Sequence, residues 1–166
     1  MPRPTNYESA RWDESALTIR EIDAQDVSST WLVMRQLRPH LSENEYVERV
    51  ARMQKTDHFR LVAISCDQEV SAVAGFRVME MLYCGRILSI DDLVVDEKAR
   101  SRGLGRQLLG WLREKALEIE CTQIHLDSRF IRVDAHRFYR REGFGKLGFH
   151  FVMDLDLHRE YQKSQP

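Results

Sequence analysis

The stretch Leu93–Gly105, which reads LVVDEKARSRGLG, decides how this chain of 166 residues folds. It begins as an apolar run, passes through a charged turn and ends with glycines at the expected start of a helix. The first N–H groups of a helix have no intrahelical partner, and the helix dipole adds partial positive charge there. We therefore interpret this strand–turn–helix as a cradle for the phosphates of an anionic ligand.

Glycines and polar side chains give the turn its anion-binding character. Gly103 and Gly105 lack Cβ atoms where a phosphate must approach the backbone. Charge-assisted hydrogen bonds to a phosphate are expected from Arg100, Ser101, Arg102 and Arg106. The alternative is an ordinary turn between a strand and a helix, which two glycines alone would favour. The spacing differs from the Walker loop, which ends in Gly-Lys-Ser/Thr, and from the dinucleotide fingerprint GxGxxG.

Length and composition exclude several classes of protein. The chain is sized for one domain with a real core. Its net charge is −1, so no overall field draws it to nucleic acid or to an anionic membrane. Apolar runs are too short to span a bilayer, and Met1–Arg20 lacks the apolar core of a signal peptide. Cys66, Cys84 and Cys121 are far apart, which argues against disulfides and zinc and favours a cytoplasmic protein.

Hydrophobic periodicity predicts a mixed α/β fold with the order β-α-α-β-β-β-α-β-α-β. Strands are expected over residues 16–22, 59–65, 70–81, 86–95, 121–129 and 149–157. Helices are expected between Asp23 and Pro39, from Ser42 to Met53, from Leu104 to Ile119 and over 133–142. The helix after Val95 is expected to be a right-handed crossover between parallel strands. The predicted organisation is a loose arm over 1–15, one domain over 16–158 and a polar tail over 159–166.

Local signals predict three details of these elements. Ser42 and Glu45 have the spacing of a capping box at a helix start. Gly143 follows the last predicted helix and suits its C′ position. Gly75 lies in the middle of a predicted strand, which indicates a bulge or a close approach of two backbones.

A second motif, AHRFYRREGF, covers Ala135–Phe144. On a helix, Ala135 and Phe138 share a face that is expected to pack on the sheet. Another face carries His136, Tyr139 and Arg140. That face is expected to look toward the space between the parallel strands. The alternative is a core tyrosine on an amphipathic helix.

Together, Arg-x-x-Gly-x-Gly and Ala-x-x-Phe-Tyr-x-x-x-Gly-Phe resemble the two diagnostic motifs of the GNAT acyltransferase superfamily. The resemblance runs from about Leu17 to Leu155. It implies a GNAT-like fold with splayed parallel central strands. It also implies a bacterial-type, single-domain N-acetyltransferase that needs no metal. The acyl group would move directly from acetyl-CoA to a primary amine in a ternary complex.

The resemblance also assigns site residues. It implies that Tyr139 is the general acid for the departing thiolate. The pantetheine arm would pair with the backbone of Leu93, Val94 and Val95. The remaining cofactor contacts would come from Arg100, Ser101, Arg102, Gly103, Leu104, Gly105, Arg106, His136 and Arg140. Two positions depart from the family pattern. Arg132 stands where many members have an Asn that touches the pantetheine arm, so Ser128 or Arg132 would make this polar contact. Glu97 stands where a proline is common.

The general base is left open among four candidates. Asp91 and Asp92 are adjacent in a predicted strand, and opposite faces of the strand are expected to receive them. Resemblance favours Asp91, because related enzymes often place an acid two residues before the position of Leu93. The alternative for either carboxylate is a salt bridge to Arg77 or Arg86. Two further candidates are Glu80 and an ordered water molecule.

Several functional alternatives stay open. A non-catalytic acyl-CoA sensor or a partner-binding domain would use the same scaffold. A cluster of arginines forms either a solvated helix face or contacts to cofactor phosphates. Its members are Arg129, Arg132, Arg137, Arg140 and Arg141. RNA binding is less favoured, because no interleaved aromatic residues offer stacking surfaces. The acceptor is expected to be a small-molecule or peptide amine, but the sequence does not identify it or the acyl-chain length. A homodimer is a further open alternative.

Overall fold

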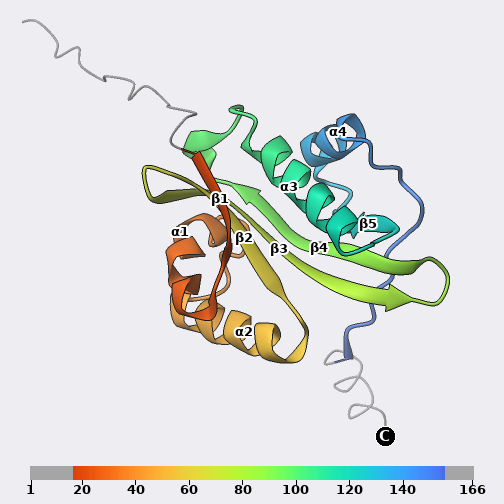
Figure 1. Cartoon of the computed structure of the whole chain (residues 1–166), viewed down its shortest axis with the longest axis horizontal. Helices are drawn as coiled ribbons and strands as arrows, with labels where there is room; N and C mark the ends of the chain where they lie inside the picture. The colour runs from red at the N-terminus through yellow and green to blue at the C-terminus, as the bar shows by residue number, and fades with distance from the viewer. Residues whose placement is uncertain (1–16, 156–166) are drawn as a thin grey trace, which may run out of the picture. The chain divides into compact units, whose positions relative to one another are not determined.

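The computed structural model describes residues 17–155. These residues fall into two compact units, of which the first ends at Leu126 and the second begins at Asp127. The first unit is a five-stranded sheet with helices on both faces (Figure 1). Several predicted parts lie outside the described residues. These are the arm over 1–15, residue 16 and residues 156–158 of the predicted domain, and the tail over 159–166. One domain over 16–158 stays a prediction.

The sheet has the order β1-β2-β3-β4-β5. Its strands are β1 (Leu17–Ile22), β2 (Arg60–Cys66), β3 (Glu69–Met81), β4 (Gly85–Val95) and β5 (Gln123–Leu126). The helices of the first unit are η2 (Ala24–Thr30), α1 (Trp31–Met34), α2 (Glu43–Thr56), η3 (Glu97–Ala99) and α3 (Leu104–Glu118). The second unit contains α4 (Val133–Arg141).

The sheet is mixed, with one parallel pair of strands. Strands β1 to β4 are antiparallel neighbours, and β4 pairs with β5 in parallel after the α3 crossover. This parallel pairing runs only from Ile87 opposite Gln123 to Ile90 opposite Leu126. Beyond Ile90, the described part of β4 pairs with β3 alone.

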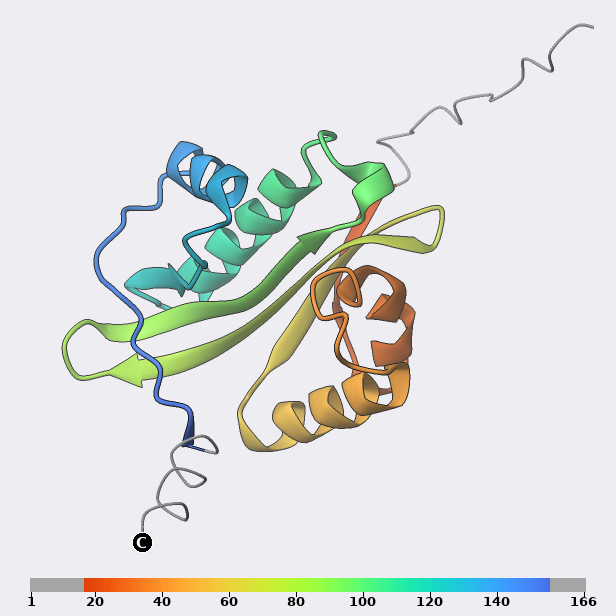
Figure 2. The same cartoon turned by 180° about the vertical axis from the view of Figure 1, so that it is seen from behind.

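Helices cover the two faces of the sheet with apolar stripes. α1 and α2 lie on one face and α3 lies on the other (Figure 2). Tyr46 and Val50 of α2 are buried on the first side, and their spacing of four residues places them on one side of the helix. On the other side α3 buries the residues Leu104, Leu108, Leu109, Leu112 and Ala116. Burial of one such leucine side chain contributes about 1.5–3 kcal/mol.

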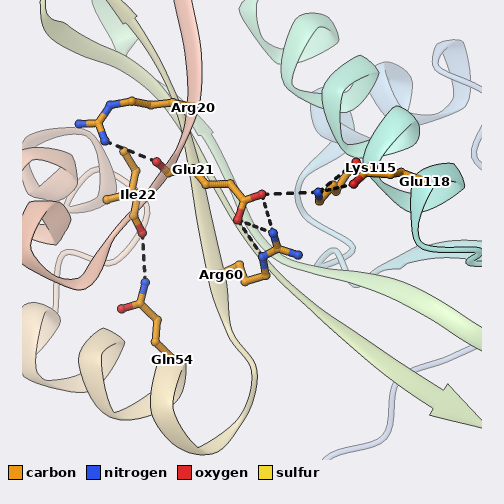
Figure 3. A network of polar contacts seen from close by, with 7 residues as sticks. All are labelled: Arg20, Glu21, Ile22, Gln54, Arg60, Lys115 and Glu118. Carbon is orange, nitrogen blue, oxygen red and sulfur yellow. Dashed lines mark hydrogen bonds and ion pairs between the residues drawn. The ribbon is translucent and has the colours of Figure 1, made fainter.

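Polar contacts tie these layers to the edge of the sheet. Glu21 on β1 accepts from Nε of Arg60 on β2 at 2.8 Å, and its carboxylate lies 4.0 Å from Nζ of Lys115 on α3 (Figure 3). Nε2 of Gln54 on α2 donates to the carbonyl of Ile22 at 3.2 Å (Figure 3). Strand β1 is therefore linked to a helix on each face.

Both predicted capping signals at helix ends are confirmed. The capping box is present, since Ser42 accepts from the Glu45 backbone and the Glu45 side chain accepts from the Ser42 backbone. Gly143 ends α4 with φ +93°. Asp23 precedes the first helix without making a side-chain capping bond. That helix begins as the 3₁₀ helix η2 and continues only briefly as α1.

The last two predicted strands differ from the observed structure. The strand expected over 121–129 is confined to 123–126, because pairing with β4 stops there. The strand expected over 149–157 is not formed over 149–155, and its last two residues lie outside the described part. Its alternating apolar side chains are exposed, for example Phe151 at 90%. Alternation alone does not make a strand, because a strand also needs a partner.

Candidate active site

The pairing of β3 with β4 is irregular next to Gly75. Gly75 lies opposite Asp92, whereas the next residue, Phe76, lies opposite Ile90. Asp91 is therefore an extra residue on β4. This is a β-bulge, which bends the strand and re-aims its side chains.

The bulge was one of the two alternatives predicted for Gly75, and the residue also allows two side chains to approach the strand closely. A Cβ atom at this position would lie 2.5 Å from Cζ of Phe59 and 3.3 Å from Oδ2 of Asp92. The first separation is shorter than any stable carbon–carbon contact. Glycine at this position thus lets the Phe59 ring and the Asp92 carboxylate pack directly over the strand.

The bulge places both neighbouring carboxylates on one face of the sheet. Asp92 lies opposite Gly75, and Arg77, two residues further along β3 on the same face, forms an ion pair with Asp91. The guanidinium of Arg77 lies 5.8 Å from the ring centroid of Phe59. The expectation that Asp91 and Asp92 face opposite sides is wrong, because strict alternation does not survive the extra residue.

Asp92 is the more enclosed of the two carboxylates. Its side chain is only 14% exposed, and Nε and Nη2 of Arg38 lie 2.8 and 2.7 Å from its Oδ1 atom. Burial raises the pKa of Asp92 above its usual 3.8, and the nearby Arg38 charge opposes this rise. A carboxylate with a raised pKa is a stronger base than a solvated aspartate.

Asp91 and Glu80 are each paired with an arginine and are more exposed than Asp92. Nε of Arg77 donates to Asp91 at 2.7 Å, and Ser89 Oγ lies 3.5 Å from the same carboxylate. The salt bridge to Arg77, one of the alternatives from the sequence, is thus present. Glu80 is 69% exposed near the hairpin end of β3 and lies 3.7 Å from Arg86.

A small pocket opens beside Asp92 between β4 and the two early helices. Its volume is about 120 Å³. Its charged lining groups are Arg38, Arg49 and Asp92. Its apolar lining consists of Met34, Leu41, Tyr46, Val50, Met53 and Phe59. The pocket therefore combines apolar walls with a carboxylate and two guanidinium groups, a composition that suits a small polar ligand.

The polar groups behind the pocket are satisfied. Tyr46 and Thr30 share a hydrogen bond of 2.7 Å between their hydroxyl groups, and Thr30 Oγ1 donates to the carbonyl of Val27. Burial raises the pKa of Tyr46 to about 12. The Trp31 ring lies 5.5 Å from the Tyr46 ring. Tyr46 is thus a neutral wall residue.

Residues 91–95 of β4 form an edge that β5 does not cover. The pairing with β5 ends at Ile90, and Val95 lies opposite Ala72 of β3. In such a strand, alternate backbone groups point away from the one partner that is present. This edge contains the three expected backbone contacts for pantetheine, namely Leu93, Val94 and Val95.

The loop after β4 has the geometry of an anion site. Gly103 is the N-cap of α3 with φ +79°, and Ser101 also has positive φ, at 64°. The first intrahelical bond joins the N–H of Gln107 to the carbonyl of Gly103 at 3.0 Å. The N–H groups of Leu104 and Gly105 therefore have no acceptor within the helix. Four side chains of the loop are exposed, namely Arg100, Ser101, Arg102 and Arg106.

Gln36 connects this loop to the segment after α1. Its Nε2 donates to Asp96 Oδ2 at 3.0 Å, and its Oε1 accepts from the N–H of Glu97 at 3.0 Å. Asp96 also accepts from the N–H of Lys98 at 2.8 Å. These bonds fix the start of the loop relative to the pocket wall that carries Arg38.

α4 in the second unit carries the predicted tyrosine. The Tyr139 ring lies 5.5 Å from Phe138 and 5.8 Å from Phe144. Tyr139 is half-buried, and this burial raises its pKa above 10.0, while the nearby Arg132 charge opposes the rise. Tyr139 therefore remains a protonated donor at neutral pH.

The other expected residues of the second unit are mostly exposed. His136 is half-buried, whereas Arg140 is exposed, as are the remaining members of the arginine cluster, Arg129, Arg132, Arg137 and Arg141. Ser128 Oγ is buried and has no hydrogen-bond partner among the described residues. Such an atom is costly unless a ligand or water satisfies it.

Neither a metal centre nor a membrane helix is found in residues 17–155. No group of at least three His, Cys, Asp and Glu side chains is placed there to hold a metal ion. Within the same residues, every helix is too short or too polar to traverse a bilayer.

The sequence matches the family model described as the acetyltransferase (GNAT) family over residues 24–144. The chain belongs to this family. The matched GNAT region contains both the loop after β4 and α4, so it includes both motifs that carried the resemblance.

Relatives and solved structures agree with this assignment. Glucosamine 6-phosphate N-acetyltransferase 1 of Oryza sativa subsp. japonica is 31% identical over 155 residues, covering 87% of this chain and 92% of the relative. Aminoalkylphosphonate N-acetyltransferase of Salmonella typhimurium is 33% identical over 98 residues, covering 59% and 63%. This GNAT protein is an acetyl-CoA-dependent N-acetyltransferase.

A solved aminoglycoside N-acetyltransferase in complex with CoA superposes with a TM-score of 0.75. It is 13% identical, and the match covers 83% of this chain and 93% of that chain. At this identity the likeness shows the GNAT fold alone.

Sequence reasoning missed the residues that shape the pocket. Arg38 and Arg49 carry no motif, and each arginine alone reads as a surface charge. Arg38 lies after the end of α1 and Arg49 lies on α2, and neither position is marked by a local sequence signal. The bulge that turns Asp92 toward Arg38 depends on cross-strand pairing, which a single sequence does not encode locally.

Proposed function

We propose that this N-acetyltransferase moves the acetyl group directly to an amine in a ternary complex. The amine occupies the pocket beside Asp92, and the thioester lies along the open edge of β4. The observation that carries this proposal is a largely enclosed carboxylate that lines a pocket and belongs to the part of β4 that β5 does not pair with. Both reactants can then meet without passing through a covalent enzyme intermediate.

The loop residues fit coenzyme A. Gly103 supports this proposal because its positive φ exposes the start of α3, and no atom lies within 4 Å of a Cβ built on it. The helix N–H groups and the exposed loop arginines suit a pyrophosphate. Backbone groups of Leu93, Val94 and Val95 would hold the pantetheine arm, and Leu104 and Gly105 would contribute N–H groups to the phosphates.

We assign the base to Asp92 rather than to Asp91, which the sequence had favoured. Asp92 lines the pocket, and its pKa is raised by burial. Asp91 is held by Arg77 and does not line the pocket. In this assignment Asp92 accepts the proton of the acceptor ammonium, directly or through a water molecule, and Asp91 fixes Arg77 beside Phe59.

Tyr139 is the proposed acid. Its raised pKa keeps the phenol protonated, so it can donate to the thiolate that leaves. His136, Arg140 and Arg132 are proposed contacts to the cofactor. The buried Ser128 hydroxyl supports a polar contact at the position that the family commonly gives to Asn.

The acceptor is proposed to be a small amine. The relatives are named for aminoalkylphosphonate and for glucosamine 6-phosphate, both small amines. The limited volume of the pocket supports the same size class over a folded protein substrate. A cytoplasmic location and a homodimer remain predictions; light scattering in solution tests the dimer.

Two aspartate variants test this assignment. Asp92→Asn keeps the side-chain shape but removes the base, and general base catalysis is typically worth about 10²–10⁴-fold. We expect Asp92→Asn to lose at least 100-fold in the rate of acetyl transfer, and Asp91→Asn to lose less. Equal losses, or a larger loss in Asp91→Asn, would return the base to Asp91. Binding of acetyl-CoA without turnover of any amine would instead favour an acyl-CoA sensor.

A further inference from the structure

The pocket beside Asp92 contains an excess of positive charge. Arg38 and Arg49 contribute two guanidinium groups, and Asp92 contributes one carboxylate. Arg38 binds this carboxylate through both Nε and Nη2. The charge of Arg49 is therefore left over after the pocket carboxylate has been paired.

Within the part of the chain that the structure describes, Arg49 is not engaged by a close carboxylate. Among residues 17–155, no ion pair joins Arg49 to an acidic side chain. The pKa of Glu45, one turn earlier on α2, is lowered mainly by its hydrogen bonds to Ser42, and Arg49 adds a smaller Coulombic contribution. Glu45 is held in the capping box instead, so the guanidinium of Arg49 remains available at the pocket.

The charged groups are arranged by depth. The Asp92 side chain is nearly enclosed, whereas Arg49 is exposed. Apolar side chains, including Val50 and Met53 of the same helix, line the space with them. A complementary ligand has a cationic end for the inner carboxylate, a short apolar body and an anionic end for the outer guanidinium.

We propose that the acceptor is a short amine with an anionic group, such as a phosphonate or carboxylate, at its other end. This inference rests on the proposed acetyl transfer at Asp92. The amine nitrogen lies toward Asp92, and the anion binds Arg49 at the mouth of the pocket. A second cation at that end is disfavoured by Arg49, and a neutral end leaves the guanidinium without a ligand partner.

Matched acceptors test this preference. Aminoethylphosphonate and β-alanine carry an anion, ethanolamine carries a neutral hydroxyl and ethylenediamine carries a second cation. We expect kcat/KM with acetyl-CoA to be about 10-fold higher for the anionic amines than for ethanolamine, the effect of one charge-assisted contact. Equal values for all four amines, or a preference for ethylenediamine, would overturn the proposal.

Two arginine variants on α2 locate the preference. Arg49→Gln should raise KM for the anionic amines about 10-fold and leave KM for ethanolamine unchanged. Arg52→Gln is the matched control, because Arg52 is an exposed arginine of the same helix that does not line the pocket. A loss of the same size in Arg52→Gln, or for ethanolamine in Arg49→Gln, would show that general charge and not Arg49 selects the acceptor.

Calorimetry with CoA present separates this proposal from the proposed transfer. Binding of aminoethylphosphonate that weakens in Arg49→Gln, without turnover, would retain the acceptor class and overturn the transfer reaction. Turnover of amines without any preference for an anion would retain the transfer reaction and overturn the acceptor class. Neither binding nor turnover of the anionic amines would overturn the acceptor class.

Discussion

Gly75 of β3 lies directly opposite Asp92 of β4, and Oδ2 of Asp92 packs 3.3 Å from the position that a Cβ atom of residue 75 would occupy. The bulge beside this pair makes Asp91 the unpaired residue and turns both carboxylates to the pocket side of the sheet. The backbone of a sheet, and not a loop, thus places the proposed base. Sites built on strands are positioned more rigidly than sites built on loops.

The first prediction concerns Gly75. Gly75→Ala should destabilise the fold by about 1–3 kcal/mol, because the Phe59 ring and the Asp92 carboxylate must move away from the new methyl group. Acetyl transfer should fall as well. Urea denaturation measures the stability. Gly110→Ala on α3 is the control, since no atom lies within 4 Å of a Cβ there; it should be neutral or stabilise by up to about 1 kcal/mol. A Gly75→Ala protein of normal stability would contradict this packing.

The second prediction concerns pH. Asp92 acts when deprotonated, so kcat/KM should rise with pH through the pKa of Asp92, which burial raises above 3.8, and should then level off. The Arg38 charge lowers this pKa and the Asp91 charge raises it. Arg38→Gln should therefore move the acid limb to higher pH, and Asp91→Asn should move it to lower pH. If the acid limb of both variants stayed at the wild-type pH, a group other than Asp92 would be responsible for it.

The third prediction concerns the loop. Gly103→Val places a branched side chain where the phosphates are proposed to approach, so affinity for CoA should fall at least about 10-fold. Gly85→Val is the matched control for backbone strain, because Gly85 has φ +77° at the hairpin between β3 and β4. Each variant should lose about 1–2 kcal/mol of stability from the left-handed backbone. Only Gly103→Val should bind CoA more weakly, and calorimetry measures this. Normal affinity in that variant would leave Gly103 with a turn role alone.

The fourth prediction concerns Tyr139. A thiol has a pKa near 8.5, so a thiolate leaves fairly well unaided, and Tyr139→Phe should lose toward the lower end of about 10²–10⁴-fold in transfer rate. Stability and affinity for acetyl-CoA should change little, because the ring is kept. Tyr83→Phe, at a tyrosine that is 74% exposed, is the control. A rate loss matched by an equal loss of affinity would make Tyr139 a binding residue.

Local signals in the sequence predicted the strand–loop–helix of the cofactor side. Positions of apolar residues, the Ser42 capping box and the glycines Gly103 and Gly143 each depend on near neighbours in the chain, and the structure has these features. Their prediction succeeded because helix starts and ends are set by local hydrogen bonding.

Features that depend on distant pairing were not predicted correctly. The common face of Asp91 and Asp92 follows from the register of β4 against β3, and the pocket follows from the approach of Arg38 and α2 to β4. The alternating segment over 149–155 shows the same limit, because its pattern specifies a strand but not a partner. Tertiary contacts decide all three.

The most direct measurement incubates the protein with acetyl-CoA and the panel of small amines, then quantifies free CoA thiol and acetylated amine together. We predict that thiol and acetylated amine form in equal amounts with wild type, and that both fall at least 100-fold in Asp92→Asn while CoA still binds. Thiol release without acetylated amine, or equal product formation by Asp92→Asn, would contradict base-assisted direct transfer at this pocket.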